Sequence, residues 1–222
     1  MTVNFNINNN PKIYGNGGPV INVFGINNAV IQGRINNNTD IRGGGTGAVG
    51  SPVFIHPEDN SVAKVEVVGN TISNVGNDPG IMALSHGDGA SAVNANLDVT
   101  IQSNSITLGG SGVAGNGTLA IDTRAGSNNG DVIKTCANVS SNFVTLAAPA
   151  DDVAWLLREG SNTSNLYVQG WNTDSNTTWN SRSNTPANST IVFNASGAPA
   201  IGPPPSGSPY FGACRAPTHP SQ

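Results

Sequence analysis

The chain has 222 residues, of which only 10% are charged, and its formal net charge is −4. Nucleic-acid binding requires clustered Lys and Arg to neutralise phosphates, so we expect no nucleic-acid partner. Gly and Asn are frequent, and both favour turns over helices, so the composition predicts short strands joined by many turns. The sequence contains no apolar run of the ~18 residues that a membrane-spanning helix needs, so we expect no membrane span.

The first part of the chain gives a weak repeat and a polar cluster. The stretch "VIQGRINNN" (residues 30–38) resembles later segments, with Gly33 standing where they have an asparagine. A Gly-rich stretch, residues 35–52, is interpreted as a loop between repeats. The stretch "FIHPEDN" that follows places His56 close to Glu58 and Asp59, a pattern more typical of a polar turn after a strand.

Three later segments share one pattern, in which apolar residues alternate with small polar ones before an asparagine and a second apolar pair. Alternation with a period of two is typical of strands. A repeat length in the mid-thirties indicates units that must stack on one another to bury their apolar faces. The three segments are "VEVVGNTISNV" (65–75), "VTIQSNSITLG" (99–109) and "ANVSSNFVTLA" (137–147).

The repeat predicts an all-β fold, a right-handed parallel β-helix with irregular loops over residues 1–202. A β-propeller fits less well because each blade needs four antiparallel strands, and only two or three strands are found per repeat. The core is expected to stack residues of successive coils about 4.8 Å apart. The residues expected in this stack are Val67, Val99, Ile101, Val139, Ile72 and Ile106.

Asn70, Asn104 and Asn142 recur at the same point of the three segments. Asn tolerates the left-handed backbone that sharp bends require, and stacked amides can bond along the axis of a solenoid. We therefore expect these three asparagines at equivalent, buried corners.

A second set of segments gives candidate binding residues. Aligning "GIMALSHGDG" (80–89), "TLAIDTRAGSN" (118–128) and "VAWLLREGSN" (153–162) places His86, Arg124 and Arg158 in one column. Such a column is either a stripe of donors for an acidic sugar or another anion, or a solvated ladder. In the second interpretation it is partly neutralised by the nearby acids, which are Asp88, Asp122 and Glu159.

Catalysis is the less favoured interpretation. A glycoside hydrolase needs two carboxyl groups about 5 to 9 Å apart, and no pair is marked out by the sequence, although Asp122 lies beside the arginines. Asp151 and Asp152 fall in a turn before Trp155, which we expect in the core. If the chain is an enzyme, we expect a polysaccharide lyase or a glycoside hydrolase.

No cofactor or metal site is expected. Asp-rich loops could hold calcium, but the stretches "GNDPG" and "SHGDGAS" match neither the EF-hand loop nor the glycine-rich nonapeptide. The polar segment at residues 172–190 is expected to be a surface excursion, which makes Trp179 the better candidate for stacking on a sugar.

The Pro-rich tail, residues 203–222, contains Cys214, and the other cysteine is Cys136. Either both are free thiols, or they form a disulfide that ties the tail back to the solenoid. We favour the disulfide because the composition is typical of extracellular proteins.

The chain resembles the carboxy-terminal region of large secreted bacterial surface proteins, in which Ig-like or cadherin-like modules are joined to β-helix stretches. The residues that carry the resemblance are "CANVSSNFVTL" (136–146), "WLLREGSNTSNLYVQGW" (155–171), "FGACRAP" (211–217) and the "VVGNTIS" segment. The resemblance implies a parallel β-helix in a secreted or cell-surface protein, with flanking domains in a longer chain. It implies no catalytic residues.

The expected function is therefore a non-catalytic structural or adhesive module of an exported bacterial surface protein. The alternative is a β-helix protein that binds or processes carbohydrate. Polysaccharides and cell-surface components are the expected partners.

Overall fold

The structure, a computed structural model, describes most of the first two thirds of the chain and parts of the remainder. The described residues are 1–15, 18–43, 50–74, 78–87, 94–109, 119–126, 132–145, 153–159, 164–169, 184–185, 191–195 and 214–218.

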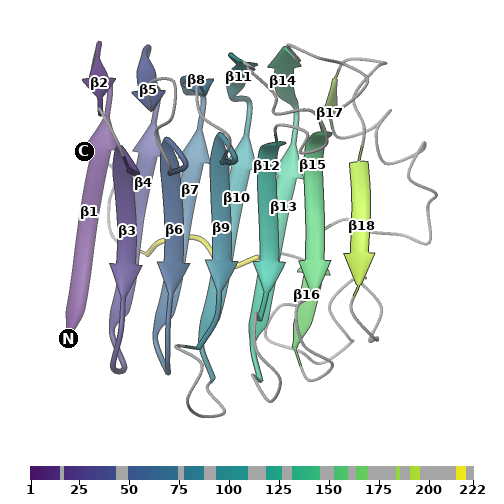
Figure 1. Cartoon of the computed structure of the whole chain (residues 1–222). Coiled ribbons are helices and arrows are strands. Elements are labelled where there is room, and N and C mark those ends of the chain that lie inside the picture. Colours follow the sequence, from purple (N-terminus) through teal and green to yellow (C-terminus); the bar gives the residue numbers. More distant parts are fainter. Residues whose placement is uncertain are drawn as a thin grey trace.

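The described strands form three parallel sheets, each of six strands (Figure 1). The first sheet contains β1 (Thr2–Asn8), β4 (Val30–Asn36), β7 (Val62–Val68), β10 (Asn96–Gln102), β13 (Lys134–Ser140) and β16 (Asn165–Val168). The second contains β2 (Ile13–Tyr14), β5 (Ile41–Gly43), β8 (Thr71–Asn74), β11 (Ser105–Leu108), β14 (Asn142–Thr145) and β17 (Asn184–Thr185). The third contains β3 (Ile21–Gly25), β6 (Val53–Pro57), β9 (Ile81–Ser85), β12 (Leu119–Ala125), β15 (Val153–Glu159) and β18 (Ile191–Ala195).

The chain visits the three sheets in turn, and each strand pairs with the strand one coil further on. This arrangement is a parallel β-helix, as the repeat predicted. The described part of the chain contains no helix, and hence none that is long and apolar enough to cross a membrane.

The inward side chains stack from coil to coil, as expected. In the first sheet Val67 pairs with Ile101, which pairs with Val139, and in the second sheet Ile72 pairs with Ile106. All five side chains are buried, and Val99 lies in the neighbouring inward row. Burying a Val or Ile side chain stabilises a fold by about 1.5–3 kcal/mol, so this continuous core is the main source of stability.

The corner between the first and second sheets has the same backbone in every described coil. One residue with positive φ is followed by an asparagine. The left-handed residue is therefore the one before the predicted corner asparagine, and not that asparagine itself. The residues with positive φ are Asn9, Asn37, Gly69, Ser103 and Ser141.

The asparagines that follow form a hydrogen-bonded ladder along the solenoid. In each of the first four, the backbone N–H and the Nδ2 group donate to Oδ1 of the asparagine in the next coil, at 2.8–3.1 Å. Nδ2 of Asn104 also donates to the Val67 carbonyl oxygen at 2.8 Å. The ladder consists of Asn10, Asn38, Asn70, Asn104 and Asn142, of which the last four are buried. Asn70, Asn104 and Asn142 thus lie where the spacing predicted.

The structure corrects the alignment and the loop boundaries predicted for the earlier coils. Gly33 pairs with Val65, inside a strand, and Asn38 occupies the corner beside Asn70. Residues 35–52 include the last two residues of β4 and the strand Ile41–Gly43, so the prediction of a loop is wrong for those five residues. The second expected excursion, residues 172–190, contains the strand Asn184–Thr185; Trp179 and the remaining residues before Asn184 lie outside the described part of the chain.

Residues 214–218 of the tail, which we call the strap, cross the outer face of the first sheet (yellow trace behind the strands in Figure 1). Cys214 forms the predicted disulfide with Cys136 on β13. Arg215 makes an ion pair with Asp98 on β10 at 2.6 Å. Thr218 donates from its backbone N–H to the side chain of Gln32 on β4 at 3.0 Å. The strap therefore joins strands from separate coils.

Candidate functional site

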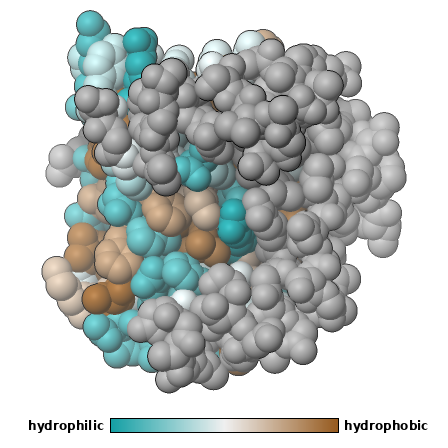
Figure 2. Space-filling view, in the orientation of Figure 1, coloured by the Kyte–Doolittle hydropathy of each residue, from teal (hydrophilic) through white to brown (hydrophobic). Residues whose placement is uncertain are grey.

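The outer face of the third sheet carries polar and apolar side chains side by side (Figure 2). His56 lies on β6, and Glu58 comes directly after that strand, two residues beyond His56 and on the same side of the backbone. His86 directly follows β9 in the next coil, and a parallel β-bridge pairs it with Glu58. Backbone pairing between coils thus brings together residues that are distant in the sequence.

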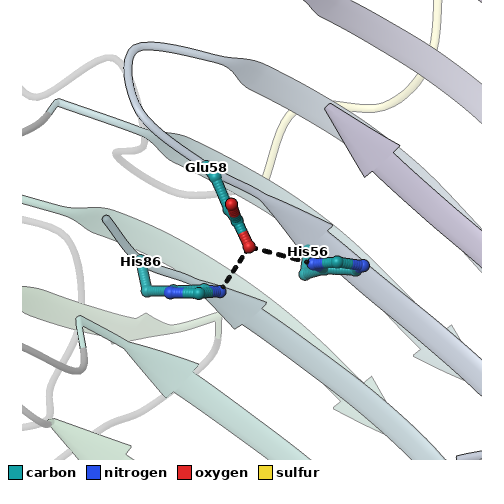
Figure 3. A group of neighbouring side chains, drawn as sticks. All are labelled: His56, Glu58 and His86. Atoms are coloured by element: carbon teal, nitrogen blue, oxygen red, sulfur yellow. Dashed lines mark hydrogen bonds and ion pairs between the residues drawn. The ribbon is translucent and has the colours of Figure 1, made fainter. Parts of the chain in front are cut away.

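The three side chains converge on one carboxylate oxygen (Figure 3). Oε1 of Glu58 lies 2.9 Å from Nε2 of His86 and 3.3 Å from Nδ1 of His56. The three ligand atoms all lie within 4.8 Å of one another. Each side chain is half-buried, so the cluster is held by its neighbours yet remains open to solvent.

The other nitrogen of each imidazole also faces an oxygen atom. Nε2 of His56 lies 2.8 Å from Oδ1 of Asn22, on β3. Nδ1 of His86 lies 2.8 Å from the carbonyl oxygen of Gly87. Each imidazole thus has an oxygen atom near both of its nitrogens, and a neutral ring donates its one N–H to only one of them. In the tautomer that donates to Asn22 or to the Gly87 carbonyl oxygen, the nitrogen that faces Glu58 carries the lone pair.

Aromatic rings hold His56 in place. Its ring stacks on Phe54 with centroids 4.0 Å apart, and Phe24 stacks at 4.5 Å. Burial lowers the pKa of His56 below its ordinary value of 6.5, and the nearby His86 lowers it further. The hydrogen bond and the charge of Glu58 act in the opposite direction. The balance favours a neutral imidazole at neutral pH.

The predicted column of donors is only partly correct. Arg124 pairs with Arg158 in the register of the third sheet, but its partner on the other side is Leu84. His86 is placed two residues further on, because Ser85 pairs with Ala125. A shift of two residues keeps every side chain on the same face of a strand, so the alternation could not reveal it.

The structure also shows the surroundings of Asp122, the acid beside this column. Asp122 is buried, and Arg124 on the same strand donates to its Oδ2 at 2.6 Å. This ion pair within one strand favours the interpretation of a neutralised ladder at Arg124. The Arg158 side chain and residues Asp88, Asp151 and Asp152 lie outside the described residues.

Trp155 lies in the core, as expected. It is only 1% exposed, and its indole N–H donates to the hydroxyl oxygen of Thr123 at 3.0 Å.

Two features of the site were missed from the sequence. The first is the contact of His56 and Glu58 with His86, because the sequence analysis interpreted His56 and Glu58 only as part of a polar turn. A histidine two residues before a glutamate, with a second histidine one coil later, is the signal that could have found this cluster. Using that signal requires the correct register between β6 and β9. The second is Asp98, a charged residue on β10 that is buried beneath the strap.

Comparisons with protein-family models, with curated proteins and with solved structures found no match to this chain.

Proposed function

We propose that the chain is a non-catalytic structural or adhesive module of an exported bacterial surface protein. The observation that carries the proposal is that the buried polar side chains named here bond to other parts of the fold. The buried asparagines bond to one another from coil to coil, and the buried Asp98 pairs with Arg215. The asparagine ladder stabilises a solenoid scaffold, and solenoids of this kind offer long surfaces for binding.

The disulfide supports the location. Disulfides form and persist in oxidising compartments, including the cell exterior, and the bond between Cys136 and Cys214 ties the tail to the first sheet. A low content of charged residues and the resemblance to secreted surface proteins favour the same location. The partners that fit such a module are polysaccharides or other components of a cell surface.

Two measurements test the proposal. Antibodies against the purified chain should label intact cells that produce the protein. Incubation of the chain with neutral and acidic polysaccharides should leave their length distribution unchanged. If the polysaccharides are shortened, the non-catalytic role is wrong and carbohydrate processing takes its place; labelling only after lysis would contradict the surface location.

A further inference from the structure

We propose that His56, Glu58 and His86 form a binding site for a divalent transition-metal ion such as Zn²⁺. The inference is independent of the proposed function. It starts from the convergence of two imidazole nitrogens on one carboxylate oxygen, at 2.9 and 3.3 Å.

The surroundings of the two imidazoles suit a cation bound between them. Asn22 Oδ1 and the Gly87 carbonyl oxygen can accept the N–H of the outer nitrogens, which would leave Nδ1 of His56 and Nε2 of His86 as lone-pair donors beside the Glu58 carboxylate. A metal ion bound by these three atoms would take the place of the hydrogen bonds that the imidazoles otherwise make to Glu58.

The same contacts are those of a metal site with its supporting groups in place. Histidines that bind a metal generally donate their other N–H to a carbonyl or carboxylate oxygen, which fixes the ring and its tautomer. The second ring nitrogens of His56 and His86 both lie 2.8 Å from such an oxygen. The stacked rings of Phe24 and Phe54 restrict His56 further.

The spacing and the ligand types favour zinc or a related ion over calcium. Zn–N and Zn–O bonds of about 2.0–2.1 Å in a tetrahedron separate neighbouring ligand atoms by about 3.3 Å, close to the distances of the two histidine nitrogens from Oε1 of Glu58. Imidazole nitrogen suits Zn²⁺, Cu²⁺ and Ni²⁺, whereas Ca²⁺ takes oxygen ligands. Three protein ligands leave one tetrahedral position for water or for a donor from a partner.

The test is calorimetric titration of the tag-free chain, stripped with a chelator, with ZnCl₂. We expect one site per chain. Glu58→Gln and His86→Gln should each weaken zinc binding by about tenfold or more, and Asn22→Ala should weaken it by about 10–100-fold through loss of the group that orients His56. The matched controls are Asp59→Asn, which neutralises the neighbouring carboxylate, and His219→Gln, which removes the remaining histidine of the chain.

Histidine NMR of the wild-type chain keeps the proposal falsifiable if a variant does not fold. Zinc should shift the Nδ1 resonance of His56 and the Nε2 resonance of His86, and should leave His219 unshifted. Equal zinc affinity of the wild type and Glu58→Gln, or the absence of these two shifts at saturating zinc, would overturn the assignment.

Discussion

The outer faces of the first and third sheets differ in how they use their polar groups. On the first sheet, the strap covers outward side chains, and Asp98 and Cys136 are bonded to Arg215 and Cys214. On the third sheet, His56 and His86 converge on Glu58 and remain half-buried. The first arrangement ties the tail to the solenoid through internal contacts, whereas the second forms the ion-binding site that we propose.

The burial pattern records this difference along the strands. Along β7, buried inward residues alternate regularly with half-buried outward residues. β10 and β13 each contain three consecutive buried residues, with Asp98 and Cys136 in the middle. The strap therefore buries outward positions of these two strands. Its removal should mainly lower the free energy of unfolding.

The largest expected effect is loss of the disulfide. Replacing Cys136 and Cys214 together by Ala opens a loop of 78 residues. By loop-closure entropy this should lower the free energy of unfolding by about 4 kcal/mol. Urea unfolding measures the change, and wild-type chain in reductant should lose a similar amount. A loss below about 1 kcal/mol would contradict a stabilising role for the strap, since native disulfides in small domains contribute several times more.

The next effect concerns the asparagine corner, which joins the first sheet to the second. Asn104→Ala removes the donors to the Val67 carbonyl and to Asn142, and the acceptor used by Asn70. Buried partners left without hydrogen bonds should lower the free energy of unfolding by about 1–3 kcal/mol. Thr107→Ala, at an exposed position of β11, is the control and should change it little. Equal losses for both variants would rule out the ladder as a specific stabilising element.

The third prediction concerns the pH dependence of the ion pair between Asp98 and Arg215 on the first sheet. Burial raises the pKa of Asp98 above its ordinary value of 3.8, and Arg215 opposes this rise. The folded chain thus holds the Asp98 proton more tightly than the unfolded chain, so the ionised carboxylate destabilises the fold at neutral pH. Arg215→Met should strengthen that destabilisation to about 1–2 kcal/mol at neutral pH.

Arg215→Met should have a lower free energy of unfolding than the wild type at neutral pH. This deficit should shrink as the pH falls through the raised pKa of Asp98 towards 3.8. Chemical denaturation across this pH range measures it. In an Asp98→Asn background the same substitution should give a difference that does not vary with pH. A deficit that grows on acidification would refute the pairing of Asp98 with Arg215.

Much of the first sheet and its corner could be predicted from the sequence. Strict alternation located the inward residues, and the recurrence of Asn70, Asn104 and Asn142 located the corner. The earlier coils were misaligned because Asn38 follows a strand that contains Gly33, where the small residue was mistaken for the corner.

The third sheet could be predicted only in part, because its connections vary in length. Residues 75–80 link β8 to β9, whereas residues 109–118 make the equivalent link from β11 to β12. Such variation removes the fixed spacing that sets register, and a two-residue error left the polar and apolar faces unchanged. His86 was consequently assigned to the arginine column instead of to Glu58. Burial of Asp98 depends on a strap over 100 residues away, which no local pattern reports.

The separation between a stabilising face and a binding face is tested most directly by thermal unfolding of two variants with and without ZnCl₂. The account predicts that Asn104→Ala lowers the unfolding temperature but keeps the full zinc-induced rise, since ligand binding stabilises only the state that binds it. Glu58→Gln should keep the metal-free unfolding temperature near that of the wild type and lose the zinc-induced rise. A zinc-induced rise of wild-type size in Glu58→Gln, or its loss in a folded Asn104→Ala, would contradict the account.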